Sequence, residues 1–162
     1  MIHAYIEWEH KMGPGSIRIR VVTSRDEILS LEQEEKAVHL AFRPSDKDLF
    51  SLVKTCPGIE ILQLPASSYD GLSKFIKMYL ESSGIHLVKG DVSGHWHDLN
   101  NYFVIPSYVL EKIKELEVQG RTEEEIIGEV TNLRKISPDM ILHLLHSSFL
   151  TAYPERPGLN NI

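Results

Sequence analysis

Short apolar runs rich in β-branched residues recur through the first half of the chain, and a turn and a helical pattern follow most of them. The runs begin at residues 17, 37, 59 and 85, so successive starts lie 20, 22 and 26 residues apart. Strand, turn and helix repeated at this spacing indicate parallel strands joined by right-handed crossovers. The pattern predicts an α/β fold with a small parallel sheet of βα repeats over residues 17–104.

The best-defined helical pattern in this part follows the third run. Its apolar positions recur at three- and four-residue intervals and form one stripe: Leu72, Phe75, Ile76, Tyr79 and Leu80. Gly84 supplies a C-terminal stop. The repeat length also falls within the range of about 20–29 residues found in leucine-rich repeats. A leucine-rich-repeat-like solenoid therefore stays open as the alternative fold.

Beyond residue 98 the pattern contains helices only. Pro106 and Ser107 open the first helical segment, Thr122 caps the second and Ser137 caps the third. Hydroxyl caps, and a proline at a first helical position, are typical helix starts. We expect a C-terminal three-helix subdomain over residues 105–150.

The two ends of the chain do not continue these patterns. Residues 1–11 alternate apolar and polar positions, and a Gly-Pro-Gly-Ser breaker cluster follows at residues 13–16. We treat residues 1–16 as an N-terminal extension. Residues 151–162 are rich in proline and glycine and are expected to form a loose tail.

The three C-terminal helices have a helix-turn-helix-like arrangement, in which the third helix would read DNA. The face of that helix expected to be exposed has no arginine or lysine and consists of Asp139, His143, His146, Ser147 and Ser148. Phosphate contacts would fall to Lys112, Lys114, Arg121, Arg134 and Lys135. We therefore favour a protein-interaction or dimerisation surface, and we keep DNA binding and a cap on the open edge of the sheet as alternatives.

The charge balance also argues against a nucleic-acid binder. The chain of 162 residues has a formal net charge of -6, and it divides into two parts of -3 each at residue 104. The single cysteine, Cys56, allows no internal disulfide, and the N-terminus lacks a signal-peptide core, so we expect a reducing cytosol. No apolar run approaches the length of a membrane span, and no membrane partner is expected.

Parallel strands direct the loops that follow them to one edge of a sheet, where ligands bind in such folds. Polar or cationic residues in those loops are Arg43, Ser45, Ser67, Ser68 and Lys89. Hydroxyl-capped helix N-termini beside two cations favour a small anion such as phosphate or carboxylate. The alternative is that the serines only cap their helices.

A second candidate site lies in the segment Gly94-His95-Trp96-His97-Asp98. Two histidines two residues apart on an extended segment point to the same side, so His95, His97 and Asp98 are candidate metal ligands. The alternative is a pair of loop histidines with no ligand. Cys56 is interpreted as a small core residue rather than a nucleophile.

Nucleotide-binding and hydrolase fingerprints are missing from the sequence. It contains no GxGxxG, no Walker motif, no GxSxG and no HExxH. We therefore expect no cofactor, and we favour a binding or regulatory protein over an enzyme. A small metal- or anion-binding enzyme that uses the strand-edge loops stays open.

Three stretches carry a family resemblance: "IRIRVVTSRDEIL", "VHLAFRPSDKDLFSLVKTCPGIEILQLP" and "GDVSGHWHDLNNYFVIPSYVLEKIKEL". In this order they resemble a family of short archaeal proteins of unknown function, known mainly from methanogens, over residues 17 to about 149. The resemblance implies an archaeal cytosolic protein and assigns no functional residues.

Overall fold

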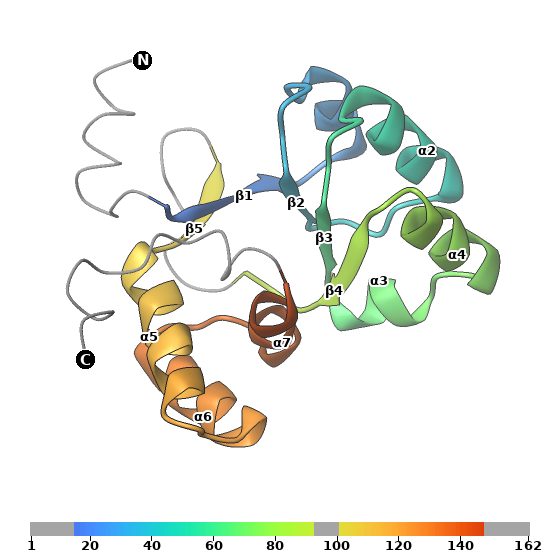
Figure 1. Ribbon diagram of the computed structural model, residues 1–162. Helices are drawn as coiled ribbons and strands as arrows, with labels where there is room; N and C mark the ends of the chain where they lie inside the picture. Colours follow the sequence, from blue (N-terminus) through green and yellow to red (C-terminus); the bar gives the residue numbers. More distant parts are fainter. Residues whose placement is uncertain (1–14, 93–100, 148–162) are drawn as a thin grey trace, which may run out of the picture.

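The computed structural model describes residues 15–92 and 101–147, which form one five-stranded sheet between two layers of helices (Figure 1). The strands are β1 (Ile17–Val22), β2 (Ala37–Leu40), β3 (Ile61–Leu64), β4 (His86–Lys89) and β5 (Tyr102–Ile105). Their spatial order is β4-β3-β2-β1-β5. The first four run parallel, and β5 pairs antiparallel with β1. The predicted parallel sheet is confirmed.

The strand β5 corrects the expectation that only helices follow residue 98. It consists of Tyr-Phe-Val-Ile, a run of four aromatic and β-branched residues that ends at Pro106. Such residues favour a strand, and proline cannot donate a hydrogen bond to a continued ladder. The run is short and lacks a polar alternation, so neither a strand period nor a helix period is visible in the sequence.

The first helical layer covers one face of the sheet. It contains the 3-10 helix η1 (Arg25–Ser30) and the helices α2 (Asp46–Thr55), α3 (Ala66–Asp70) and α4 (Lys74–Ser82). Because the order of the parallel strands never reverses, right-handed crossovers place all of these connections on the same side. Leu49 and Leu52 of α2 and Ile76 and Leu80 of α4 are buried against the sheet.

The second layer covers the face that these crossovers leave open. It consists of α5 (Ser107–Val118), α6 (Glu123–Leu133) and α7 (Pro138–His146) (Figure 1). The three helices share one hydrophobic core with the inward positions of the strands, among them Ile19, Val21, Ile61 and Ile105. The C-terminal helices therefore cover a face of the sheet rather than its edge. An open solenoid would leave that face bare.

Burial on both faces explains the composition of the central strands. All four residues of β2 and of β3 are buried, as expected for strands that are covered on both sides. In β1 the odd positions Ile17, Ile19 and Val21 face α5–α7. Within the described residues, no helix has the length and apolar character needed to cross a membrane.

Candidate functional site

The two cations predicted to bind an anion, Arg43 and Lys89, approach the C-terminal end of α3, at the edge where the parallel strands end. Lys89 Nζ lies 2.8 Å from Asp70 Oδ1. Arg43 lies beside Gly71: its Nη2 is 2.6 Å from the position that a Cβ on residue 71 would occupy. The structure thus brings the cation that follows β2 and the cation that ends β4 to the same short helix.

These groups also have structural partners. The hydrogen bond that Lys89 donates to Asp70 raises the pKa of Lys89. Ser45 caps α2: its hydroxyl accepts from the backbone N–H of Asp48, and its own N–H donates to Asp48 Oδ2 at 2.8 Å. Ser45 therefore caps its helix, as the alternative interpretation of these serines predicts.

The remaining two serines lie on α3, where Ser68 is buried and Ser67 is exposed. Ligand crevices in such sheets form where the strand order reverses, and among the described residues the four parallel strands keep one order. The anion pocket stays a prediction.

The proposed metal ligands His95, His97 and Asp98 lie outside the described residues. Among residues 15–92 and 101–147, no three His, Cys, Asp or Glu side chains are grouped closely enough to hold a metal ion.

Cys56 is buried, as expected for a core residue. Burial, and to a smaller extent Glu35, raises the pKa of its thiol to about 11, so at neutral pH it is a protonated thiol.

A buried polar pair connects two central strands and was missed by the sequence reasoning. His39 of β2 and Gln63 of β3 are register partners, and the Gln63 amide nitrogen lies 3.0 Å from His39 Nδ1. Burial lowers the pKa of His39 to about 4, although Asp91 acts in the opposite direction. A neutral His39 accepts the hydrogen bond from the amide. The signal was present in the sequence, as one polar residue within each of two apolar runs.

The N-terminus of α7 lies against the end of β4, close to this pair. Asp139 Oδ2 accepts a hydrogen bond of 2.7 Å from the backbone N–H of Lys89. A Cβ at Gly90 would lie 2.3 Å from Ser137 Cβ and 3.6 Å from Gln63 Cδ, so the absence of a side chain at Gly90 allows the N-cap of α7 to approach.

The rest of α7 also faces the sheet or the other helices. Met140, Ile141 and Leu144 are buried, and the half-buried His143 contacts His86 of β4 with ring centroids 4.7 Å apart and the rings tilted by 46°. Burial and the neighbouring His86 lower the pKa of His143. The expectation that Asp139, His143 and Ser147 lie on an exposed face is therefore wrong, since all three are only partly exposed, and Ser148 lies outside the described residues.

Of the nine residues of α7, only Pro138 and His146 are exposed. His146 Nε2 lies 2.5 Å from Glu123 Oε1 at the start of α6, which connects the second and third helices of the C-terminal part. We call the contact surface between α7 and β4 the α7–β4 seam; it comprises Lys89, Gly90, Ser137, Asp139, His86 and His143.

A second unpredicted cluster lies on the opposite face, beside β1 and β5. The Tyr102 hydroxyl donates a hydrogen bond to Glu35, and the guanidinium carbon of Arg18 lies 3.9 Å from the centre of the Tyr102 ring. Arg20 lies 5.6 Å from the same ring. Burial is the largest cause of the raised pKa of both Glu35 and Tyr102. The alternation Ile-Arg-Ile-Arg in β1 was the sequence signal for this cluster.

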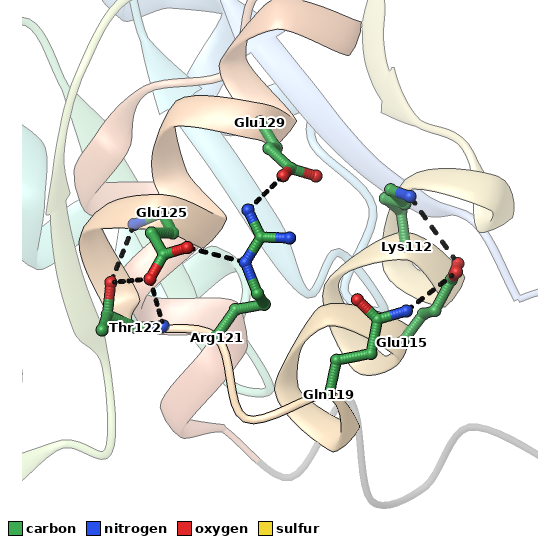
Figure 2. Close-up of polar contacts among 7 residues, drawn as sticks. All are labelled: Lys112, Glu115, Gln119, Arg121, Thr122, Glu125 and Glu129. Atoms are coloured by element: carbon green, nitrogen blue, oxygen red, sulfur yellow. Dashed lines mark hydrogen bonds and ion pairs between the residues drawn. The ribbon is translucent and has the colours of Figure 1, made fainter.

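The outer surface of α5 and α6 is dominated by carboxylates. Arg121 donates to Glu125 at 2.7 Å and to Glu129 at 2.5 Å, and Lys112 lies 3.8 Å from Glu115 (Figure 2). The Arg121 guanidinium is the largest cause of the lowered pKa of Glu125. Residues 107–147 carry five Lys and Arg against eight Asp and Glu, so this part has a net charge of -3.

Two family models match the chain. The N-terminal domain of a family of unknown function (DUF1699) matches residues 18–101, and the DUF1699 C-terminal HTH domain matches residues 108–146. No curated protein and no solved structure matches the chain. The expected relation to a family of unknown function is confirmed, whereas the archaeal and methanogen origin stays a prediction. The first family model alone covers more than half of the chain, so the chain belongs to the DUF1699 family.

Proposed function

We propose that this protein is a non-enzymatic binding and regulatory protein whose C-terminal helices engage a protein partner or a second copy of the chain. The observation that carries the proposal is the α7–β4 seam. A helix-turn-helix protein reads DNA by placing its third helix in the major groove. Here the third helix is α7, and most of its surface is occupied by contacts with the sheet and with its neighbouring helices.

Charge supports the same proposal. Protein–DNA affinity depends on lysine and arginine contacts to phosphates. The C-terminal part has a net charge of -3, and Glu123, Glu124 and Glu125 lie together in the first turn of α6. Arg121 is already bonded to two carboxylates. This surface would repel a phosphate backbone more than it would attract one.

The outer helices retain apolar side chains that a protein partner would cover. Tyr108 and Val118 on α5 and Leu133 on α6 are at least half exposed, and Val118 reaches 80%. Apolar side chains among charged ones are typical of protein–protein contact surfaces, in which a dry centre is surrounded by a polar rim. The localisation that goes with this role, the cytosol, is part of the proposal.

The first experiment separates protein binding from DNA binding. Fluorescence anisotropy with mixed-sequence duplex DNA at low salt should show no binding at micromolar protein. Light scattering on the full chain should then show whether its mass is that of one 18.5 kDa chain or of two. If the chain self-associates, Val118→Asp should restore the monomer, and Leu29→Asp, at a similarly exposed position on η1, should not.

DNA binding is the second candidate, because the matched C-terminal family domain is described as a helix-turn-helix domain. Under this alternative α7 would have to leave β4 before it could read DNA. Weakening the seam by Asp139→Ala would then increase DNA affinity, whereas the protein-binding proposal predicts no DNA binding by either form.

A small metal- or anion-binding enzyme is the third alternative, and its test is elemental analysis of untagged protein for stoichiometric metal.

A further inference from the structure

An exposed apolar patch lies on the first helical layer, on the opposite side of the sheet from α5–α7. It comprises Phe50 of α2 and Phe75, Met78 and Tyr79 of α4, and we call it the α2–α4 patch. Phe75 and Met78 are 67% and 68% exposed. The Phe50 and Tyr79 rings meet edge to face with centroids 4.8 Å apart, so the patch is continuous from one helix to the other.

Helical geometry explains why these side chains point outward. Leu49 and Leu52 of α2 and Ile76 and Leu80 of α4 occupy the faces that pack on the sheet. Phe75 and Tyr79 are four residues apart and therefore share a different face of α4, the one toward α2. The core is complete beneath them, so the exposed aromatic and methionine side chains are not needed to fill it. Contiguous exposed apolar side chains of this kind mark interaction sites.

Lysines frame this patch. On α2, Lys47 precedes Phe50 by three residues and Lys54 follows it by four, and on α4 Lys74 precedes Met78 by four. All three lysines are exposed, and within the described residues none of them has an ion-pair partner. The acid Asp48, in contrast, is engaged by Arg25 at 3.3 Å and by the Ser45 cap. Two exposed acids, Asp46 and Glu81, lie at the same helical spacing from Phe50 and Met78. The patch therefore combines apolar anchors with a small excess of lysines that have no ion-pair partner among the described residues.

We propose that the α2–α4 patch binds an amphipathic helix of a partner protein, with acidic side chains flanking its apolar face. Apolar residues at helical spacing would contact the aromatic and methionine side chains, and the flanking carboxylates would meet Lys47, Lys54 and Lys74. Lysine and aromatic side chains also occur together in single-strand nucleic-acid sites, but the net charge of -6 and the central methionine favour protein. This binding goes beyond the proposed role of α5–α7 and does not rest on it.

The patch and the outer surface of α5 and α6 lie on opposite layers (Figure 1). A partner on one layer therefore leaves the other accessible, and the protein would connect two partners as an adaptor. Each layer has its own exposed apolar residues, Phe75 and Met78 on one and Val118 on the other. Substitutions in one layer thus test that layer alone.

The test uses a labelled designed peptide of about 18 residues, long enough to form a helix when bound. The peptide carries leucines at helical spacing on one face and glutamates beside them, and its counterpart has lysine at every glutamate position. Titrated with the full chain, the acidic peptide should bind at least about tenfold more tightly than the basic one. Hydrogen exchange should show protection in α2 and α4 when the acidic peptide is bound.

Variants place the binding on the patch. Phe75→Ser combined with Met78→Ser should weaken binding of the acidic peptide at least about tenfold. Leu29→Ser, at a position on η1 that is 77% exposed, should leave it unchanged. Lys54→Glu with Lys74→Glu should reverse the preference between the two peptides. Urea midpoints and circular dichroism of each variant would show that the fold is retained.

Three results would overturn the proposal. Equal binding of the acidic and basic peptides would remove the charge complementarity. Unchanged binding by the Phe75 and Met78 variant would place the peptide elsewhere. Displacement of the peptide by an oligo(dT) strand at comparable concentration would show that the patch serves nucleic acid instead.

Discussion

Asp139, in the first turn of α7, accepts a 2.7 Å hydrogen bond from the backbone N–H of Lys89, the last residue of β4. The bond joins the part of the chain that matches the helix-turn-helix domain to the part that forms the sheet. The same carboxylate lies where the helix macrodipole favours negative charge. One side chain therefore stabilises both the start of α7 and its attachment to the sheet.

Removal of this carboxylate should weaken the α7–β4 seam. We expect Asp139→Ala to lower the free energy of unfolding by about 1.5–3 kcal/mol, the range for a hydrogen bond to a charged group. Asp139→Asn keeps an acceptor oxygen and should lose less. Urea denaturation at neutral pH measures both. Glu34→Ala, at an exposed loop position, is the control and should change stability by less than about 0.5 kcal/mol. Equal midpoints for the Asp139 and Glu34 alanine variants would contradict the structural role of the bond.

Gly90 and Ser137 should be energetically coupled. A Cβ at position 90 would lie 2.3 Å from Ser137 Cβ and 2.4 Å from its hydroxyl oxygen, so Gly90→Ala should cost about 1–3 kcal/mol through overpacking. Ser137→Gly removes both of those atoms, and glycine is a tolerated N-cap that costs only a few tenths of a kcal/mol. The double variant should therefore be more stable than Gly90→Ala alone. A double-mutant cycle in urea measures the coupling. Additive effects would show that α7 does not approach Gly90 as described.

An alanine at position 128, in contrast to one at position 90, should stabilise the protein. Gly128 lies inside α6, and a Cβ there would have no atom within 4 Å. Glycine in a helix interior costs roughly 0.5–1 kcal/mol relative to alanine, because the unfolded chain has more conformational freedom. Gly128→Ala should therefore raise the thermal midpoint. A lowered midpoint would indicate that a neighbouring element occupies the space outside α6.

The order and direction of β1–β4 were predictable because each strand and its crossover repeat a local pattern. The strand starts at 17 and 37, the caps of α2 and α6 and the buried Ile76 and Leu80 of α4 are all features of nearby residues. The other two strands begin at residues 61 and 86, and the predicted five-residue stripe is wrong at two positions, because Leu72 precedes α4 and Phe75 is exposed. What α5–α7 pack against was not predictable in the same way. An apolar stripe such as Val109, Ile113 and Leu116 shows that a helix has a buried face and does not identify the surface that covers it.

Among the residues of the candidate site, contacts between neighbours in sequence were predictable and contacts between distant residues were not. Capping by Ser45 needs only residues within one turn, and the sequence indicated it. The contacts of His39 with Gln63 and of Lys89 with Asp139 join residues 24 and 50 positions apart, and they depend on strand register and on the placement of α7. A lone polar residue within an apolar run is a signal for such a contact, but it does not name the partner.

His39 should make stability depend on pH. Burial lowers its pKa to about 4, whereas an unfolded histidine has a pKa near 6.5. Between these values the unfolded chain binds more protons than the folded one, so stability falls as the pH is lowered from about 6.5 to about 4. Over the full window the loss amounts to about 3 kcal/mol.

The variant His39→Gln isolates this effect, because its amide can still bond Gln63 but does not titrate. Carboxylates and His143 titrate in both proteins, so their contributions cancel in the difference between the two unfolding free energies. Measured by urea denaturation from about pH 7 to pH 4.5, the wild type should lose stability relative to the variant, by an amount that grows as the pH falls. A difference that stays constant over this range would mean that His39 binds its proton equally well in the folded and unfolded chains, and that the β2–β3 pair is not the buried neutral contact described.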